Sequence, residues 1–182
     1  LPPYAELHCL TNFSFLRGAS HPEELVERAR AQGYAALAVT DECSVAGAVR
    51  AHLAAKETGL PLVIGSELAL RDGTKLVLLV TDRASYGNLS QLITRGRRQA
   101  VKGRYALSRA DIEAFADGLL ALWVPPEVPA ATETLASAHW VATVFPGRAW
   151  LAVELFARAG DRVRLARCAT LATATGLRLV AA

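Results

Sequence analysis

Three residues with side chains of the metal-binding type follow predicted strands of the chain. His8 ends the first predicted strand, Asp41 follows the second, and Glu67 lies near the end of the third. The carboxyl ends of parallel strands meet at one edge of an α/β sheet, so these side chains are expected to converge. Imidazole nitrogen and carboxylate oxygen are typical ligands of Zn or Mn at a hydrolytic centre. The alternative is structural, because Asp41 could cap a helix that starts at Val45.

No competing catalytic motif is present in the sequence. The chain has neither the glycine pattern of a dinucleotide-binding turn nor a P-loop, and Ser66 lacks the second glycine of a nucleophile elbow. The cysteines are widely spaced and form no CxxC pair, which favours a reduced, cytosolic setting in which they pack as small apolar groups. The remaining histidines are expected to be surface or packing residues: His21, His52 and His139.

A strongly basic stretch, RGRRQAVKGR, lies near the middle of the chain. It contains five basic residues and no acid: Arg95, Arg97, Arg98, Lys102 and Arg104. Guanidinium and ammonium groups of this kind bind nucleic-acid phosphates without reading the base sequence. They also suit a solvated helix end, where positive charge is favourable. Both interpretations stay open, and a protein partner is a further candidate for the same residues.

The elements that would position these residues alternate between short apolar runs and helical periodicity. The predicted strands are Tyr4–His8, Ala36–Thr40, Leu62–Leu70, Lys75–Thr81, Gly118–Val124, Trp150–Phe156 and Leu177–Val180. The predicted helices are Ser20–Gly33, Val45–Thr58, Ala84–Ala100, a short helix capped by Ser108, Glu133–Val144 and Asp161–Thr175. Ser20 with Glu23 forms a capping box, and Asp72-Gly73 suits a hairpin-like turn. The alternation predicts an α/β fold with a parallel sheet or barrel of about seven strands.

Composition limits the remaining possibilities. With 182 residues, 52% of them hydrophobic and 20% charged, the chain fits one compact domain and is not disordered over most of its length. No apolar run approaches the roughly 20 residues of a membrane span, and the amino terminus lacks the layout of a signal peptide. A net charge of +3 does not by itself indicate nucleic acid. Because the chain lacks an initiator Met and stops on an apolar run, we expect it to be a piece of a longer protein.

Four ordered blocks of the sequence resemble one known family. They are YAELHCLTNFSFLRGASHPEELVERA, AVTDECSVAGAVRAH, LVIGSEL and KLVLLVTDRASYGNLSQLITRGRR. Together they are similar to the amino-terminal polymerase-and-histidinol-phosphatase (PHP) domain of bacterial C-family DNA polymerases, and NFSFLRGASHPEEL resembles the error-prone branch in particular. The resemblance implies a distorted seven-stranded (β/α) barrel of the PHP type over residues 1–182, whose last elements would lie beyond Ala182.

The metal-binding pattern of that family is incomplete in this chain. The family's first strand ends in His-x-His, whereas this chain reads His8-Cys9-Leu10, so Leu10 replaces the second imidazole. The next block of the family reads Asp-His, and here it reads Asp41-Glu42. The resemblance therefore leaves His8, Asp41 and Glu42 as remnants of a metal site.

The later positions of the pattern depart further. Glu67 keeps the family's carboxylate after the third strand, but Lys75 stands where a histidine is expected. The following ligand position falls near Pro125, which has no coordinating group, and the last Asp-x-His pair would lie beyond Ala182. The loss of two histidines removes neutral donors, and Lys75 adds a cation that repels a metal ion.

The positive charge of Lys75 indicates how the remaining carboxylates could be balanced. We expect its ammonium group to lie among Asp41, Glu42 and Glu67 and to replace the lost ion electrostatically, so that buried carboxylates are paired. The alternative is a Lys75 side chain that reaches into solvent.

The resemblance also implies a function for the longer protein, namely error-prone, DNA-directed DNA synthesis past damaged template, as in DNA replication and repair. The catalytic carboxylates and the Mg of such a polymerase belong to a palm domain outside this sequence. No catalytic residue and no tightly bound cofactor is therefore expected in this fragment, and residual binding of Zn or Mn stays open.

The implied partners are the rest of the polymerase chain and DNA, with the sliding clamp and accessory translesion proteins as further candidates. A cytoplasmic location without a membrane is expected. Two alternatives remain from the sequence. One is a metal-dependent phosphoesterase that uses His8, Asp41 and Glu67, and the other is a non-catalytic protein-interaction module.

Overall fold

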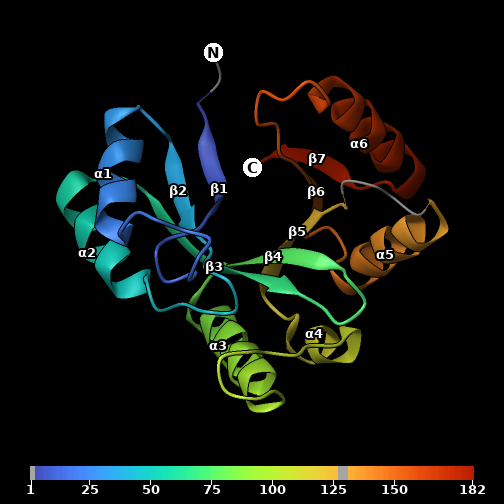
Figure 1. Cartoon of the computed structure of the whole chain (residues 1–182), viewed down its shortest axis with the longest axis horizontal. Helices are drawn as coiled ribbons and strands as arrows, with labels where there is room; N and C mark the ends of the chain where they lie inside the picture. The colour runs from blue at the N-terminus through green and yellow to red at the C-terminus, as the bar shows by residue number, and fades with distance from the viewer. Residues whose placement is uncertain (1–2, 127–130) are drawn as a thin grey trace.

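The computed structural model describes residues 3–126 and 131–182, in which strands and helices alternate along the chain (Figure 1). The strands are β1 (Ala5–Cys9), β2 (Ala36–Val39), β3 (Leu62–Ala69), β4 (Lys75–Val80), β5 (Leu119–Val124), β6 (Ala149–Val153) and β7 (Arg178–Ala181). The helices are α1 (Pro22–Ala31), α2 (Ala48–Thr58), α3 (Arg83–Arg98), α4 (Arg109–Phe115), α5 (Ala131–Val144) and α6 (Asp161–Thr175). Each strand and helix expected from the sequence is present with small shifts at its ends, and the Ser108 cap of α4 is confirmed.

The strands form one sheet in the order of the sequence, from β1 to β7. β1, β2 and β3 are parallel, as are β5, β6 and β7, but β4 is antiparallel to both β3 and β5. The sheet is therefore parallel, as expected, except at β4. The predicted hairpin is confirmed, since Gly73 has a φ of 83° in a tight turn. A crossover to a parallel strand would need about a dozen residues or more, which this short connection does not provide.

The sheet curls into a half-barrel with helices on its outer side (Figure 1). α1 and α2 pack together beside β2 and β3, α3 and α4 pack together near β4, and α5 and α6 accompany β5, β6 and β7. In the described residues β1 and β7 are the two edges of the sheet, so the expected seven-stranded barrel stays open between them. All strands except β4 run in one direction, and their carboxyl ends therefore share one end of the half-barrel.

Burial follows the alternation of side chains along the central strands. In β4, Leu76 and Leu78 pack with the helices, whereas Val77 and Leu79 belong to a cluster inside the curl, and all four are buried. Residues from other strands complete the inner cluster: Ala38, Leu122, Val124 and Ala152. Among the described helices, none is both long and apolar enough to cross a bilayer.

The start of α1 differs from the prediction by one residue. The residue before the helix is His21, whose N–H donates a hydrogen bond to Glu24 Oε2 at 2.7 Å. Pro22 occupies the first helical position, and the residue before a proline is held in an extended conformation, which makes His21 the last non-helical residue. The capping box expected for Ser20 and Glu23 is therefore wrong.

Candidate functional site: an ion-pair network at the strand ends

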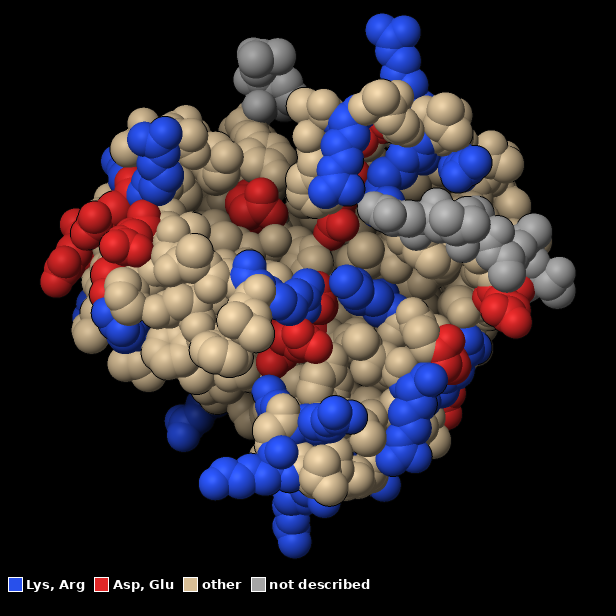
Figure 2. All heavy atoms as spheres, viewed as in Figure 1, with Lys and Arg blue, Asp and Glu red and all other residues tan. Residues whose placement is uncertain are grey.

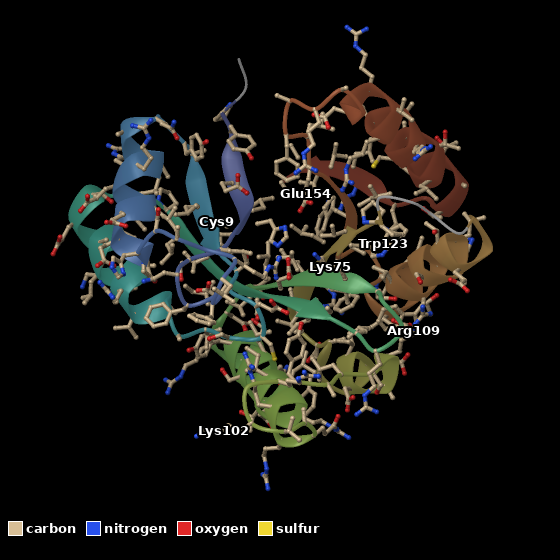
Figure 3. The ribbon with its side chains drawn as sticks, in the orientation of Figure 1. Cys9, Lys75, Lys102, Arg109, Trp123 and Glu154 are labelled. Carbon is tan, nitrogen blue, oxygen red and sulfur yellow. The ribbon has the colours of Figure 1, made fainter. Side chains whose placement is uncertain are left out.

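The end of the half-barrel where the strands finish holds a connected group of charged side chains. The sequence predicts four of its members as site residues, but neither Arg17, from the loop after β1, nor Glu154, which follows β6. Lys75 and Glu154 lie toward the middle of the molecule in Figure 3. We call the following six side chains the ion-pair network: His8, Arg17, Glu42, Glu67, Lys75 and Glu154.

Glu67 is the buried centre of the network, with 1% of its side chain exposed. Arg17 engages both of its oxygens, since Nη1 donates to Oε1 and Nη2 donates to Oε2 at 3.0 Å. His8 Nε2 lies 2.9 Å from Oε2, and Lys75 Nζ lies 3.6 Å from the same atom. Burial by itself would raise the pKa of Glu67, but the hydrogen bonds with His8 and Arg17 and the charge of Lys75 hold that pKa well below its usual range. Glu67 is therefore ionised.

His8 lies between two carboxylates. Its Nε2 contacts Glu67, and its Nδ1 lies 2.5 Å from Glu154 Oε1. Burial by itself would lower the pKa of His8, but the hydrogen bonds with Glu154 and Glu67 outweigh this effect and raise the pKa to about 9. At neutral pH the ring is an imidazolium, which has no lone pair to offer a metal ion. Arg164 of α6 extends the network, with its Nη2 3.8 Å from Glu154 Oε2.

Asp41 lies outside the network and shapes the loop that follows β1. It is buried, and its carboxylate accepts hydrogen bonds from Thr11 N and Thr11 Oγ1 at 2.8 Å each and from Ser14 Oγ at 2.6 Å. The cap suggested for Asp41 is not its role, because α2 begins only at Ala48 and the carboxylate is bound to the loop. Asp41 therefore has a different structural function, which is to hold the loop in place.

Lys75 contacts only one of the three carboxylates expected around it. Its ammonium group pairs with Glu67, but within the described residues it makes no ion pair with Asp41 or Glu42. Its side chain is 37% exposed, which places it at the rim of the network.

The cation that bridges two carboxylates is Arg17. Its Nη1 donates to Glu42 Oε2 at 2.8 Å in addition to its contacts with Glu67. The other Glu42 oxygen accepts a hydrogen bond from Tyr105 Oη at 3.0 Å. Two strand-end carboxylates that would repel each other are thus joined through one guanidinium group.

A tight turn brings Arg17 to this position. The Ser14 carbonyl accepts hydrogen bonds from the N–H groups of Arg17 and Gly18 at 2.9 and 3.0 Å. A Cβ atom on Gly18 would lie 1.9 Å from the Thr11 carbonyl oxygen, so only glycine fits there. The one sequence signal for this role is a basic residue in the loop that follows a strand-end histidine, and that signal is weak.

The donor set does not fit a divalent metal ion. By the family resemblance, one further ligand position falls on Leu10 and a later one falls near Pro125, and neither residue has a coordinating side-chain atom. Both nitrogens of His8 are committed to carboxylates, and the oxygens of Glu67 face cations. In residues 3–126 and 131–182, no group of three His, Cys, Asp or Glu side chains is placed to hold an ion. The arrangement instead neutralises the carboxylates with cations of the protein itself.

The basic stretch divides into two parts. Arg95 pairs with Asp111 at 2.7 Å, and Arg97 donates to the Cys43 carbonyl at 3.1 Å, so both stabilise the local structure. The other three are exposed and pair with no carboxylate in the part of the chain that the structure describes: Arg98, Lys102 and Arg104. These three are free to meet a negatively charged ligand.

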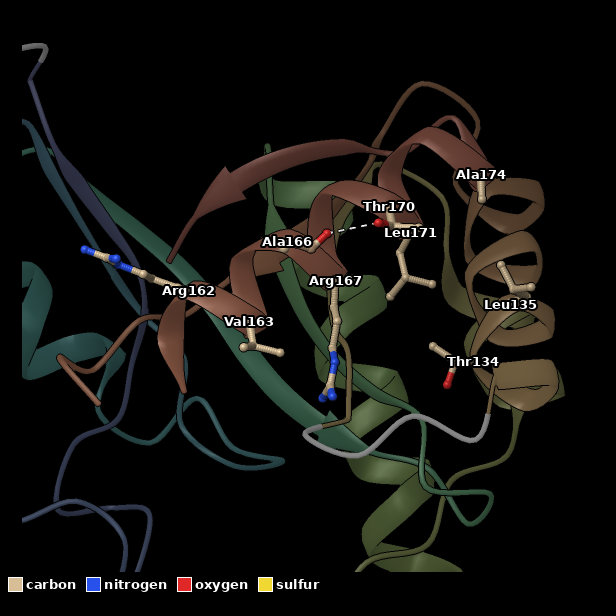
Figure 4. A pocket seen from close by; sticks show the side chains of 9 residues that line it. All are labelled: Thr134, Leu135, Arg162, Val163, Ala166, Arg167, Thr170, Leu171 and Ala174. Carbon is tan, nitrogen blue, oxygen red and sulfur yellow. Dashed lines mark hydrogen bonds between the residues drawn. The ribbon is translucent and has the colours of Figure 1, made fainter. Parts of the chain in front are cut away.

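A separate groove of about 640 Å³ lies between α5 and α6 (Figure 4). Its lining is mostly apolar, with Leu135 on α5 and Val163, Ala166 and Leu171 on α6. The Thr170 hydroxyl donates to the Ala166 carbonyl at 3.1 Å within α6. The groove shares no lining residue with the ion-pair network, so it is a different feature of the molecule.

The fold is that of a PHP-type protein. The sequence model of the PHP domain matches residues 6–141, and the chain belongs to this family. Two relatives are named error-prone DNA polymerase, one from Dechloromonas aromatica and one from Aromatoleum aromaticum. Each is 57% identical, over 186 and 183 residues that cover 100% and 98% of this chain but 18% and 17% of the relatives. The chain thus spans less than a fifth of these curated relatives, and the predicted family resemblance is confirmed.

Two solved structures share the fold. The crystal structure of a "putative metal-dependent phosphoesterase" from Bifidobacterium adolescentis has a TM-score of 0.71 and 18% identity, over 100% of this chain and 87% of that chain. An amidohydrolase from Chromobacterium violaceum, with bound sulfate and no metal, has a TM-score of 0.66 and 16% identity, over 96% and 84%. At these identities the similarity concerns the fold alone, and it confirms the predicted fold class.

Substitution of Arg17 tests whether its positive charge stabilises the buried carboxylate of Glu67. We expect Arg17→Met to lower the free energy of unfolding by about 1–3 kcal/mol, because buried Glu67 loses two charge-assisted hydrogen bonds. Arg17 is 36% exposed, which keeps the loss below that of a fully buried pair. Arg50→Met is the matched control, since Arg50 pairs with Glu23 near the surface, and it should change stability by less than about 0.5 kcal/mol. Urea denaturation measures both variants, and equal stabilities would contradict the central role of Arg17.

The raised pKa of His8 predicts a loss of stability at alkaline pH. Its folded-state pKa of about 9 exceeds the ordinary value of 6.5, so the stabilisation is complete below about pH 6.5 and disappears as the pH rises through about 9. Between about pH 7 and about pH 10, the free energy of unfolding should fall by on the order of 2 kcal/mol more in the unchanged protein than in His8→Gln. Chemical denaturation over this range measures the difference. Parallel pH profiles would show that His8 is neutral in the folded state.

Proposed function

We propose that residues 1–182 form a single PHP domain of an error-prone, DNA-directed DNA polymerase, and that the strand-end site has a structural role there in place of phosphoester hydrolysis. The family match and the relatives named error-prone DNA polymerase support the first part. The observation that carries the second part is the Arg17 guanidinium group, which lies between Glu42 and Glu67 and engages both.

The chemistry of the network argues against hydrolysis by this domain. A metal-dependent phosphoesterase centre uses metal ions to activate water and neutralise phosphate charge. Here the carboxylates that would hold such ions are bound to Arg17, His8 and Lys75. Protonated His8 also cannot accept a proton from water at neutral pH. These contacts argue against a metal-activated water at this site.

The structural role is to join elements that are distant in sequence. The network ties the loop after β1 to β3 and β4 and, through Glu154, to the end of β6. Such cross-links at one end of an open half-barrel favour a rigid domain on which the rest of a polymerase can be supported.

The proposal extends to the partners of the longer protein. Its main partner would be the rest of the polymerase chain, its substrate would be DNA with damaged template, and its location would be the cytoplasm. The Mg that such synthesis needs would be bound outside these residues, and no tightly bound Zn or Mn is proposed for this domain. The sliding clamp and accessory translesion proteins complete the proposed set of partners on the basis of the family resemblance.

A structural site predicts that stability does not depend on metal. The thermal unfolding midpoint of the purified chain should differ by less than about 2 °C between excess EDTA and excess Mn or Zn, because no ion binds the folded state specifically. Elemental analysis after dialysis should find no stoichiometric metal, and p-nitrophenyl phosphate esters should not be hydrolysed. Stoichiometric Mn or Zn together with metal-dependent hydrolysis would contradict the proposal and establish the alternative, a metal-dependent phosphoesterase.

The supporting role is tested in the full-length polymerase that contains this chain. Arg17→Met should keep primer extension within about twofold at about 25 °C and should shift heat inactivation of extension to lower temperature, because only stability is lost. Arg50→Met serves again as the control. Loss of extension at the lower temperature in a folded Arg17 variant would show that the site takes part in the reaction.

A further inference from the structure

A cavity of about 420 Å³ opens beside the ion-pair network, between the loop after β1 and the segment that follows α3. Its lining combines aromatic rings with guanidinium groups. We call it the aromatic cavity, and the side chains that matter are Phe13, Phe15, Arg97, Arg104 and Tyr105.

The loop after β1 holds large apolar side chains in solvent. Phe15 is 83% exposed and Phe13 is 42% exposed. Leu16 has a φ of 62°, a left-handed conformation that a residue with a branched side chain adopts only at a cost. The loop keeps this shape because Ser14 and Arg17 are anchored to buried carboxylates. Rings exposed on a rigid loop form a contact surface that needs little reorganisation on binding.

The charge around the aromatic cavity is positive. Arg104 lines the cavity and Lys102 lies two residues before it in the same segment, and both are exposed with no carboxylate partner among the described residues. The acidic member of the lining, Glu42, is already balanced by Arg17. Figure 2 shows Lys and Arg side chains gathered over the end of α3 and the segment after it.

We propose that the aromatic cavity binds single-stranded nucleic acid without base preference, an inference that rests on the proposed function in a DNA polymerase. Phe13 and Phe15 stack on unpaired bases, while the exposed cations of the segment after α3, Lys102 and Arg104, bind the backbone phosphates. Proteins hold single strands of any sequence by this combination of stacking and charge. A duplex fits less well, because its bases are already stacked and their faces are covered.

A single strand also fits the cavity better than a protein partner does. Protein interfaces are also rich in aromatic and Arg side chains, so the distinguishing feature here is a pair of exposed cations without carboxylate partners among the described residues, Lys102 and Arg104, which suits a phosphate backbone. Arg97 already stacks on Tyr105, with its guanidinium carbon 5.4 Å from the ring centroid, which extends the flat face of the cavity. The strand is bound and not cleaved, because the neighbouring network does not fit a metal.

Binding is measured by fluorescence anisotropy with labelled oligothymidylate of about 20 nucleotides and with a duplex of the same length. The single strand should bind at about 50 mM salt, at least about fivefold more tightly than the duplex. Phe15→Ala should weaken single-strand binding about fivefold or more without changing its salt dependence, because it removes stacking and no charge. Arg104→Ala should reduce the slope of log affinity against log salt by about 0.7.

Two variants outside the aromatic cavity serve as matched controls. Phe156, between β6 and α6, is 62% exposed, and Arg30 is exposed near the end of α1. Phe156→Ala and Arg30→Ala should bind the single strand within about twofold of the unchanged chain. Thermal unfolding tests whether all four variants are folded. Each is expected to be, because every substituted side chain is exposed.

The outcomes separate this proposal from the structural role of the network. Unchanged binding by Phe15→Ala, or equal weakening by Phe156→Ala, overturns it. Absence of single-strand binding at about 50 mM salt also overturns it. The structural role is judged separately, by metal dependence and by the stability of Arg17→Met. Stoichiometric metal binding would contradict the structural role of the network, but it would not contradict the binding of a single strand in the aromatic cavity.

Discussion

A buried, ionised carboxylate is the constraint on which the rest of this structure depends. Glu67 is almost inaccessible to water, and an unpaired carboxylate in such a place would cost several kcal/mol or more. Three cations from three parts of the chain surround it: Arg17, His8 and Lys75. The loop after β1, the strands β1 and β4 and, through Glu154, the end of β6 are thereby positioned around one negative charge.

The strand ends of this fold can hold either metal ions or cations of the protein itself. The family resemblance implies metal ions at the strand ends, whereas this chain balances the strand-end carboxylates with its own cations. The cations keep the carboxylates paired, because a guanidinium group can donate two parallel hydrogen bonds to a carboxylate. Under the proposed structural role, the site supplies no metal-bound water to attack a phosphate. Structural similarity at 16–18% identity therefore describes the scaffold, and the side chains decide the activity.

The loop after β1 links the interior of the molecule to its surface. Arg17 points into the network and Phe15 lies in solvent, yet they are separated by one residue of the same turn. The turn is held by Asp41, which binds Thr11 and Ser14. The ion pairs that stabilise the end of the half-barrel therefore also fix the orientation of the exposed rings. A change in the buried charges would alter the orientation of these rings.

Apolar periodicity is a local signal, so the order and approximate limits of the strands and helices could be predicted from the amino-acid sequence. The sequence also determined the tight turn before β4, from Asp72-Gly73, and the family, from four ordered blocks. It placed His8 and Lys75 near strand ends without specifying their partners. The bridge that Arg17 makes between the carboxylates, and the contact of Glu154 with the second nitrogen of His8, became evident from the three-dimensional fold. These contacts join residues 50 and 146 positions apart, and a local pattern does not encode which side chains meet across a curled sheet.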